Sequence, residues 1–517
     1  MSRARLLVML LCLGLLVTAH PGMAQVDREA EAIPSGVTDL VYDWMFEINQ
    51  AADISTLDHR QLKVASGCDV NGDGYDDVLV GDRDYDYQTY KDDNGRAWLF
   101  YGSSSGLSTT PDHILNPPYT NYYGFFGEQV FCDLDVNADG YDDIIIGMDN
   151  YDSAFPDEGA VFVWYGSETG PQASYDWMAR GNATYAHFAI SLDSAGDVNG
   201  DTYDDIIVGA WRYDDNNISH AYVWYGSDTG LGENGTPANA DWTASAPYPG
   251  QTNGIGFGRL VRGIGDVNGD MYDDIMIGAP NYDGGVTDQG TVYVWYGSDS
   301  GLGNSGTTAN ADWSAYSAQE NSQFGVYGDG VGDLNGDGYD DLAISAYYYD
   351  NPEANEGAVF VWYGNALGLG DPGEPANADW MAEADTPSIL GYGIRAGGDI
   401  NNDGYADLLA SAPSFPVETG SDTLTGAGAW FAWFGAPAGL GENGYPDNAN
   451  LNSYGDQAGA YLGRDDIASG DVNGDGCSDL LIASRDYENG QTDEGAIFGY
   501  YSTFQHIYIP VILRETP

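Results

Sequence analysis

One nine-residue acidic loop, Asp-x-Asn-x-Asp-x-x-x-Asp, occurs seven times in this chain at intervals of 62 to 72 residues. The first copy runs from Asp69 to Asp77 and continues directly into the apolar segment Val78-Leu79-Val80. A repeat with a fixed period indicates one structure that is built from similar units. The copies begin at Asp69, Asp135, Asp197, Asp266, Asp333, Asp399 and Asp471. The repeat therefore predicts seven related units rather than several unrelated domains.

Each loop carries the ligand types that a hard cation prefers. Positions 1, 3, 5 and 9 have oxygen-bearing side chains, and a tight loop can turn the carbonyl of position 7 toward the same point. Calcium binds oxygen ligands of this kind. An EF-hand would need Glu at position 12 and flanking helices, whereas position 12 here is apolar, as at Val80 and Ile146. The predicted ligands of up to seven calcium ions are Asp69, Asn71, Asp73, Tyr75, Asp77, Asp135, Asn137, Asp139, Tyr141, Asp143, Asp197, Asn199, Asp201, Tyr203, Asp205, Asp266, Asn268, Asp270, Tyr272, Asp274, Asp333, Asn335, Asp337, Tyr339, Asp341, Asp399, Asn401, Asp403, Tyr405, Asp407, Asp471, Asn473, Asp475, Cys477 and Asp479.

The alternative interpretation is that Asp, Asn and Gly in these loops simply make good hairpin turns. Occupation of every acidic ligand position in all seven copies favours calcium. Thr202 and Met271 replace the Gly that the other loops have at position 6, so these two sites are expected to be weaker. Position 8, which is Asp340 in the fifth loop, is expected to point away from the cation and to matter little.

The segments around each loop are typical of β-strands. They are short, β-branched or aromatic, and end near Gly, as in Ala160–Trp164. A fourth segment in most units is marked by Asp-Trp, and a further copy, Asp43-Trp44, precedes the first loop. The sequence therefore predicts an all-β fold, a seven-bladed β-propeller with four antiparallel strands per blade, closed by an N-terminal strand. The segment 508–513 is the competing candidate for the closing strand.

A motif on both sides of the loop adds a family resemblance. An aromatic residue beside Gly precedes several loops, as in Phe126-Gly127 and Phe324-Gly325, and Gly278-Ala279-Pro280 follows the fourth loop and its strand. This order resembles the FG-GAP repeat of the integrin α-subunit propeller and its bacterial relatives, over residues 37–505. The resemblance implies a seven-bladed propeller with calcium between the first and second strands of a blade. Integrins carry calcium in only some blades, and nothing here resembles the integrin stalk.

Composition and the N-terminus indicate where the protein works. The chain has 80 Asp and Glu against 16 Lys and Arg, which disfavours nucleic acids and anionic membranes as partners. Arg3 and Arg5 followed by the apolar run 6–19 predict an export signal that is cut after Ala24. We therefore expect a secreted or cell-surface protein without membrane insertion after cleavage. The expected parts are a signal peptide (1–24), a linker (25–36), the propeller (37–505) and a C-terminal tail (506–517).

The remaining cysteines limit the covalent cross-links. Cys68, Cys132 and Cys477 stay in the mature chain, so it can form one disulfide at most. The fold is therefore expected to depend on its core and its metal ions.

The sequence contains no motif that singles out a catalytic residue, and none is predicted. The loops between the second and third strands should emerge on the face opposite the acidic loops, and they combine Tyr with acidic residues. Such surfaces suit sugars or protein partners; the alternative is that Tyr-Asp is a structural loop feature repeated by duplication. The candidate ligand-binding residues are Tyr85, Tyr151, Tyr213, Tyr282, Tyr349 and Tyr487. The favoured function is extracellular protein or glycan binding, or adhesion; the alternatives are a polysaccharide lyase or hydrolase, and a structural envelope module.

Overall fold

The computed structural model describes residues 42–48, 61–86, 93–119, 123–211, 218–246, 255–419, 422–490 and 492–502. The expected signal peptide, linker and tail, the segment 508–513 and Tyr213 lie outside the described residues. Within these ranges the chain has 33 β-strands, two short 3-10 turns (Pro375–Asn377 and Pro446–Asn448) and no α-helix. Accordingly, no helix in the described part is long and apolar enough to cross a bilayer.

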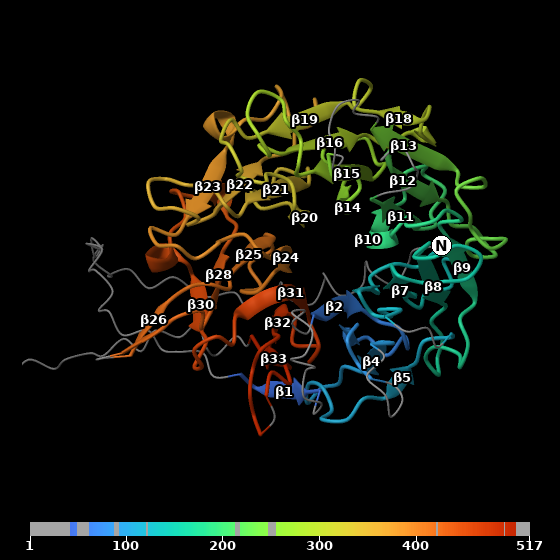
Figure 1. Cartoon of the computed structure of the whole chain (residues 1–517), viewed down its shortest axis with the longest axis horizontal. Helices are drawn as coiled ribbons and strands as arrows, with labels where there is room; N and C mark the ends of the chain where they lie inside the picture. The colour runs from blue at the N-terminus through green and yellow to red at the C-terminus, as the bar shows by residue number, and fades with distance from the viewer. Residues whose placement is uncertain are drawn as a thin grey trace, which may run out of the picture. The chain divides into compact units, whose positions relative to one another are not determined.

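Seven antiparallel sheets of four strands form the blades of a β-propeller (Figure 1). The first strands of neighbouring blades contact one another around the centre of the ring (Figure 1). The blades in chain order are β2 (Leu62–Cys68), β3 (Asp77–Asp82), β4 (Arg96–Phe100) and β5 (His113–Leu115); β6 (Gln129–Phe131), β7 (Ile144–Met148), β8 (Ala160–Trp164) and β9 (Trp177–Arg180); β10 (Phe188–Gly196), β11 (Asp205–Ala210), β12 (Ser219–Trp224) and β13 (Trp242–Ala246); β14 (Leu260–Gly265), β15 (Asp274–Ala279), β16 (Thr291–Trp295) and β19 (Trp313–Tyr316); β20 (Gly328–Gly332), β21 (Asp341–Ala346), β22 (Ala358–Trp362) and β23 (Trp380–Glu383); β24 (Ile394–Gly398), β25 (Asp407–Ala412), β28 (Ala429–Trp433) and β30 (Leu451–Tyr454); and β31 (Leu462–Gly470), β32 (Asp479–Ser484), β33 (Ala496–Tyr500) and β1 (Trp44–Glu47).

Five additional short strands lie in the loops that connect the blade strands. The two-residue strand β18 (Gly306–Thr307) pairs in parallel with β13, and β26 (Val417–Thr419) forms a hairpin with β27 (Asp422–Leu424). The strands β17 (Asp299–Leu302) and β29 (Pro437–Leu440) lie between the third and fourth strands of their blades. The repeating unit itself is therefore the four-stranded blade.

The N-terminal strand completes the seventh blade, as the sequence predicts. β1 pairs antiparallel with β33, with Trp44 opposite Gly499. The Trp44 Nε1–H donates to the carbonyl of Ser108 in the first blade at 2.8 Å. Trp177 makes the same bond to the carbonyl of Glu233 in the next blade at 2.9 Å. The seam between the last and first blades is thus built like an ordinary blade boundary, and no blade edge is left open there.

The hydrophobic core is divided among the spaces between blades. The second strand β11 is buried along its whole length because neighbouring blades cover both of its faces. One cluster joins Val163 and Trp177 of the second blade to Phe188 and Trp224 of the third. Continuous apolar segments after each acidic loop therefore encode strands that are buried on both faces.

A disulfide joins the first two blades. Cys68, the last residue of β2, is bonded to Cys132, which follows β6, and their Cα atoms are 5.5 Å apart. Cys477 is a buried free thiol. The expectation of at most one disulfide is confirmed within the described residues.

Antiparallel pairing gives the propeller two distinct faces. Loops between first and second strands all leave the blades at one end, which we call the acidic face because it carries the seven acidic loops. Loops between second and third strands leave at the other end, which we call the opposite face. The two faces can therefore have separate roles.

Candidate metal sites

Each acidic loop is wound around its position-1 side chain. The Asp69 carboxylate accepts the N–H groups of Asp73 and Gly74 at 2.9 and 2.8 Å. Asp73 in turn accepts the Tyr75 N–H at 3.2 Å. The same three bonds recur in the other six loops. The sequence motif therefore specifies one backbone conformation seven times.

The position-9 carboxylate is the buried member of each loop. Asp77 has no exposed surface, and its two oxygens accept the N–H groups of Val70 and Gly102 at 3.0 and 2.9 Å. Burial, with a smaller contribution from the carboxylates of Asp69 and Asp73, raises the pKa of Asp77 to about 8. The pKa of the equivalent Asp in the other six loops is raised to between about 7 and about 9, again chiefly by burial. A buried carboxylate beside two others favours a bound cation or a proton.

The donor set of the loops fits a hard cation. Side-chain oxygens at positions 1, 3, 5 and 9 are the ligand type that calcium prefers, and no Lys or Arg lies inside any loop. In the described residues, however, no loop brings three acidic side chains within 4.8 Å of one another. Calcium would therefore have to draw the carboxylates of positions 1 and 5 inward. The seven-site assignment stays a prediction.

Position 8 links each loop to the loop of the preceding blade. Asp142 Oδ2 accepts the Asp69 N–H at 2.6 Å, and the Asp142 N–H donates to the Asp69 carbonyl at 3.2 Å. The backbone bond is present at all seven boundaries, and the side-chain bond at every boundary except one, where position 8 is Ala406. Asp340 Oδ2 accepts the Asp266 N–H at 2.9 Å. The expectation that Asp340 matters little is therefore corrected, because its carboxylate bonds to the preceding blade.

Position 7 makes a second contact between neighbouring loops. A Cβ atom on Gly72 would lie 2.6 Å from the ring of Tyr141, the position-7 residue of the following loop. Gly200 has the same relation to Tyr272. These contacts involve residues about 70 positions apart, so a single loop sequence does not reveal them. The predicted calcium ligands at position 7 thus also hold the loops together through their rings.

The two loops without Gly at position 6 adopt the glycine conformation. Thr202 and Met271 both have φ of 75°, and the position-6 glycines of the other loops, such as Gly338 at 91°, also have positive φ. A side chain costs free energy in this region of backbone space. The tight conformation that the sequence predicts at these positions is confirmed.

The tyrosines predicted to bind a ligand are packed against their own blades. Tyr151 is only 4% exposed, and the ring of Tyr349 meets that of Phe360 edge-on at 5.5 Å. Their carbonyls also close the loops, because Gly159 donates to Tyr151 and Gly357 donates to Tyr349. Tyr85, Tyr282 and Tyr487 are likewise half-buried against core clusters. These residues have a structural role, and their role in binding stays a prediction.

A different group of aromatic residues lies on the opposite face, and sequence reasoning missed it. Tyr327 and Tyr392 have ring centroids 4.9 Å apart, and Tyr347 and Tyr348 are 4.1 Å apart. The Arg464 guanidinium lies 5.4 Å from the Tyr392 ring. We call these five residues the tyrosine–arginine cluster. They come from three blades, and the equivalent positions of other blades carry different side chains, so the periodicity of the sequence does not single them out.

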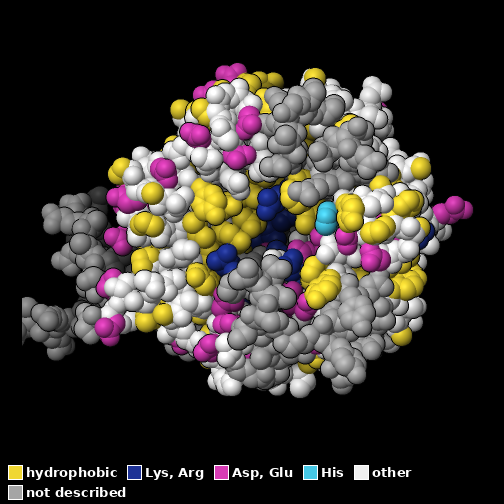
Figure 2. Space-filling view, viewed as in Figure 1, with side chains coloured by type: hydrophobic (Ala, Val, Ile, Leu, Met, Phe, Trp, Pro, Cys, Tyr) yellow, Lys and Arg dark blue, Asp and Glu magenta, His cyan; other side chains and the backbone are white. Residues whose placement is uncertain are grey.

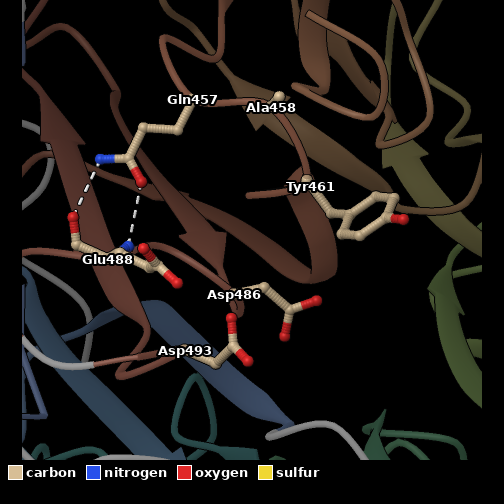
Figure 3. A pocket seen from close by; sticks show the side chains of 7 residues that line it. Gln457, Ala458, Tyr461, Asp486, Glu488 and Asp493 are labelled. Carbon is tan, nitrogen blue, oxygen red and sulfur yellow. Dashed lines mark hydrogen bonds between the residues drawn. The ribbon is translucent and has the colours of Figure 1, made fainter.

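A cavity of about 600 Å³ opens in the seventh blade on the same face. Gln457 spans its side by donating to the Glu488 carbonyl and accepting the Glu488 N–H, both at 3.0 Å (Figure 3). Asp486, Asp493 and Tyr461 complete the lining (Figure 3). Carboxylates beside an aromatic ring can bind hydroxyl-rich molecules.

Seven blades with one acidic loop each define a repeat-built β-propeller. The FG-GAP repeat family matches residues 63–100, 263–295, 326–362 and 390–429, in the first, fourth, fifth and sixth blades. Integrin alpha-5 of Xenopus laevis is 31% identical over 240 residues, which are 45% of this chain and 20% of that protein. Integrin alpha-PS2 of Drosophila melanogaster is 33% identical over 160 residues, 29% of this chain and 11% of that protein. The chain is therefore a β-propeller that contains FG-GAP repeats and is similar to integrin α-subunits.

A second group of relatives carries the name of an enzyme. Phosphatidylinositol-glycan-specific phospholipase D of Bos taurus is 35% identical over 173 residues, which are 33% of this chain and 20% of that protein. The chain matches a fifth or less of the length of these integrin and phospholipase relatives. The similarity therefore establishes the propeller, and the activities of the whole relatives do not follow from it.

Proposed function

We propose that this protein is a secreted or cell-surface propeller that binds calcium in its acidic loops and an extracellular protein or glycan on the opposite face. The observation that carries the proposal is that the described basic side chains avoid the acidic face and lie on first strands or at the opposite end of the blades. Acidic loops dominate one face, whereas basic and aromatic side chains gather at the other end. Such a division suits one face for metal ions and the other for a partner.

The basic residues show this separation most clearly. None of the nine that the structure describes lies in an acidic loop or in a loop between third and fourth strands. Each lies on a first strand or at the end of the blade that faces away from the acidic loops. Figure 2 shows Lys and Arg side chains around the central opening, beside an area of hydrophobic side chains. The nine residues are Lys63, Arg83, Arg96, Arg180, Arg259, Arg262, Arg395, Arg464 and Arg485.

The tyrosine–arginine cluster supplies the chemistry for a partner. Tyr348 is 39% exposed, and its neighbour Tyr347 is buried beneath the surface. An exposed Tyr on a rigid aromatic base offers contact area at a low entropy cost, and Arg beside it can pair with an acidic or hydroxyl-rich group. The acidic cavity of the seventh blade extends the range of groups that the face could accept. These features support protein or glycan binding.

Relatives support the same class of function. The integrin α-subunits among them favour ligand binding or adhesion, and they are extracellular or cell-surface proteins. The phospholipase D relatives favour the second candidate, an exported enzyme with a propeller. The similarity to each group lies within a fraction of the relative's length, so binding is the proposal that the geometry of the opposite face supports best. A structural envelope module is the third candidate.

The proposal is tested with an array of glycans and matrix proteins, probed in calcium and in chelator. We expect saturable binding in calcium, and Tyr348→Ala should weaken it roughly tenfold. The matched control is Leu367→Ala, because Leu367 is 86% exposed and lies on the acidic face. Binding that survives Tyr348→Ala and is lost in Leu367→Ala would contradict the proposal. Turnover on a polysaccharide or phosphatidylinositol-glycan panel would favour the enzyme instead.

A further inference from the structure

Three acidic side chains converge on the opposite face of the fifth blade. Glu353 and Glu356 lie in the loop between β21 and β22, and Asp385 follows β23. One oxygen of each lies within 4.8 Å of the others, and no other trio of His, Cys, Asp or Glu in the described ranges does so. Calcium ligands at roughly 2.3–2.6 Å are at most about 4.6–5.2 Å apart across the ion. The spacing of this trio therefore matches a single hard cation.

Glu356 is a buried carboxylate with little compensation for its charge. Its side chain has no exposed surface, and neither of its oxygens accepts a hydrogen bond of normal geometry. Burial and the carboxylates of Glu383, Glu353 and Asp385 raise the pKa of Glu356 to about 7, and the nearby Asn351 N–H offsets only part of this rise. Among the described residues, no Lys or Arg forms an ion pair with any of these four acids. Burying an ionised carboxylate without a compensating positive charge costs free energy, so a bound cation would stabilise the folded protein at this position.

The second blade shows how the same position is normally satisfied. There Glu158 occupies the place of Glu356, and its Oε1 accepts hydrogen bonds from the Ser153 hydroxyl and from the Ala154 N–H. Arg180, which is paired with Ala160 at the end of β9, donates to the same Ser153 hydroxyl at 3.0 Å. In the second blade the buried Glu158 therefore has two hydrogen-bond donors, and the positively charged Arg180 bonds to one of them.

The fifth blade has lost both forms of compensation. Pro352 stands where the second blade has Ala154, and Pro has no N–H to donate. Glu383, which is paired with Ala358 at the end of β23, stands where the second blade has Arg180. The Glu383 carboxylate accepts the Asn351 Nδ2–H at 2.6 Å, which holds a further acid beside the trio. A backbone donor has therefore been replaced by Pro352, and the cation Arg180 by the acid Glu383.

Two other blades differ from the fifth in how they satisfy this position. The seventh blade also has an acid, Glu47, at the position of Glu383. Glu494 in the seventh blade keeps one donor, because its Oε1 accepts the Asn489 N–H at 2.6 Å. The fourth blade has the neutral Gln289 at this position, whose oxygen accepts the Val286 N–H at 3.1 Å. Of these four blades, only the fifth leaves both oxygens of a buried carboxylate without a hydrogen bond of normal geometry.

We propose that Glu353, Glu356 and Asp385 bind a divalent, oxygen-preferring cation on the opposite face, with calcium as the first candidate. The ion would supply to Glu356 the positive charge that Arg180 places beside Glu158. The site is separate from the acidic loops, and it does not depend on calcium binding there. It would add a metal ion to the face that we assign to a partner.

Native mass spectrometry in calcium tests the site by counting ions. We expect the wild type to carry one ion more than Glu356→Gln, and Glu158→Gln, the matched change in the second blade, to keep the wild-type number. Asp385→Asn removes an exposed ligand without disturbing the core, and it should lose the same ion or bind it at least tenfold more weakly. Equal ion counts for the wild type and both ligand variants would overturn the proposal.

The count separates this site from the acidic loops. If the loops bind no calcium, the wild type should still carry one ion and Glu356→Gln none. A crystal soaked in manganese gives an independent measurement, because an anomalous peak should lie between the three carboxylates. Peaks elsewhere with none at this position would overturn the proposal.

Discussion

The hydrogen bond from position 8 to the preceding blade gives a sharp test of how the acidic loops hold the ring together. Asp340 Oδ2 accepts the Asp266 N–H at 2.9 Å, and both groups are partly shielded from water. Asp340→Ala leaves this N–H without a side-chain partner, which typically costs about 1–3 kcal/mol. Burial and the carboxylates of Asp273, Asp266 and Asp333 raise the pKa of Asp340, which means that its charged form is disfavoured in the folded protein. Removing this charge therefore offsets part of the free energy lost with the hydrogen bond. We expect a net loss of about 1 kcal/mol.

The boundary without this bond allows the converse experiment. Asp333 has Ala406 opposite it, and no side chain in the described part of the structure accepts its N–H. Gly332 flanks Ala406 as Gly265 flanks Asp340, so the preceding loop leaves room for a longer side chain. Ala406→Asn adds an acceptor without adding charge. It should stabilise the fold by about 1 kcal/mol, the usual net value of a hydrogen bond.

Thermal unfolding in saturating calcium measures both variants. With roughly 2.1 cal/mol/K of unfolding entropy per residue, a change of 1 kcal/mol should move the melting temperature of a propeller of this size by only about 1 °C. Replicate differential scans against the wild type are therefore needed. If Asp340→Ala melts with the wild type and Ala406→Asn melts below it, the position-8 bonds do not stabilise the blade boundaries.

Three further predictions follow from the loops and the disulfide. Thr202→Gly and Met271→Gly should each stabilise the protein by about 1 kcal/mol in thermal melts, because both residues are exposed with φ of 75°, and Gly338→Thr should show the opposite sign. Without metal, the melting temperature should fall as pH rises from about 5 to about 8. The folded pKa of Asp77 is raised to about 8 against an ordinary value of about 3.9, so stability is lost as this group ionises; a melting temperature that rises over this range would contradict the assignment. Replacing Cys68 and Cys132 by Ala should cost about 2–4 kcal/mol in denaturant titrations, and an unchanged midpoint would show that the cross-link is dispensable.

The blades could be predicted because their information is local and repeated. The loop that starts at Asp69 and the Asp-Trp pair that starts β1 each specify one element, and counting them gives the strand that closes the ring. Contacts between copies could not be predicted in this way. The bond of Asp340 to Asp266 and the ring of Tyr141 over Gly72 join residues about 70 positions apart.

The opposite face shows the same limit. Tyr151 and Tyr349 share a repeat position that suggested an exposed surface, yet packing against the third strand of their blades buries or half-buries them. The deficit at Glu356 depends on Pro352 in the same loop and on Glu383 from another strand. Only the folded blade brings these residues together. Sequence periodicity therefore identifies what the blades share, whereas the features peculiar to one blade require the structure.

The central claim is that calcium is part of this fold, and thermal unfolding with and without calcium tests it most directly. Extracellular calcium modules bind with dissociation constants of ~10⁻⁴ to 10⁻³ M. At about ten times that constant one site contributes roughly 1.4 kcal/mol, so seven independent sites would contribute roughly 10 kcal/mol. This is comparable with the whole stability of an ordinary domain, about 5–15 kcal/mol. Chelation should therefore lower the melting temperature strongly, and millimolar calcium should restore it. A melting curve that is the same in chelator and in calcium would show that the seven loops are turns and not metal sites.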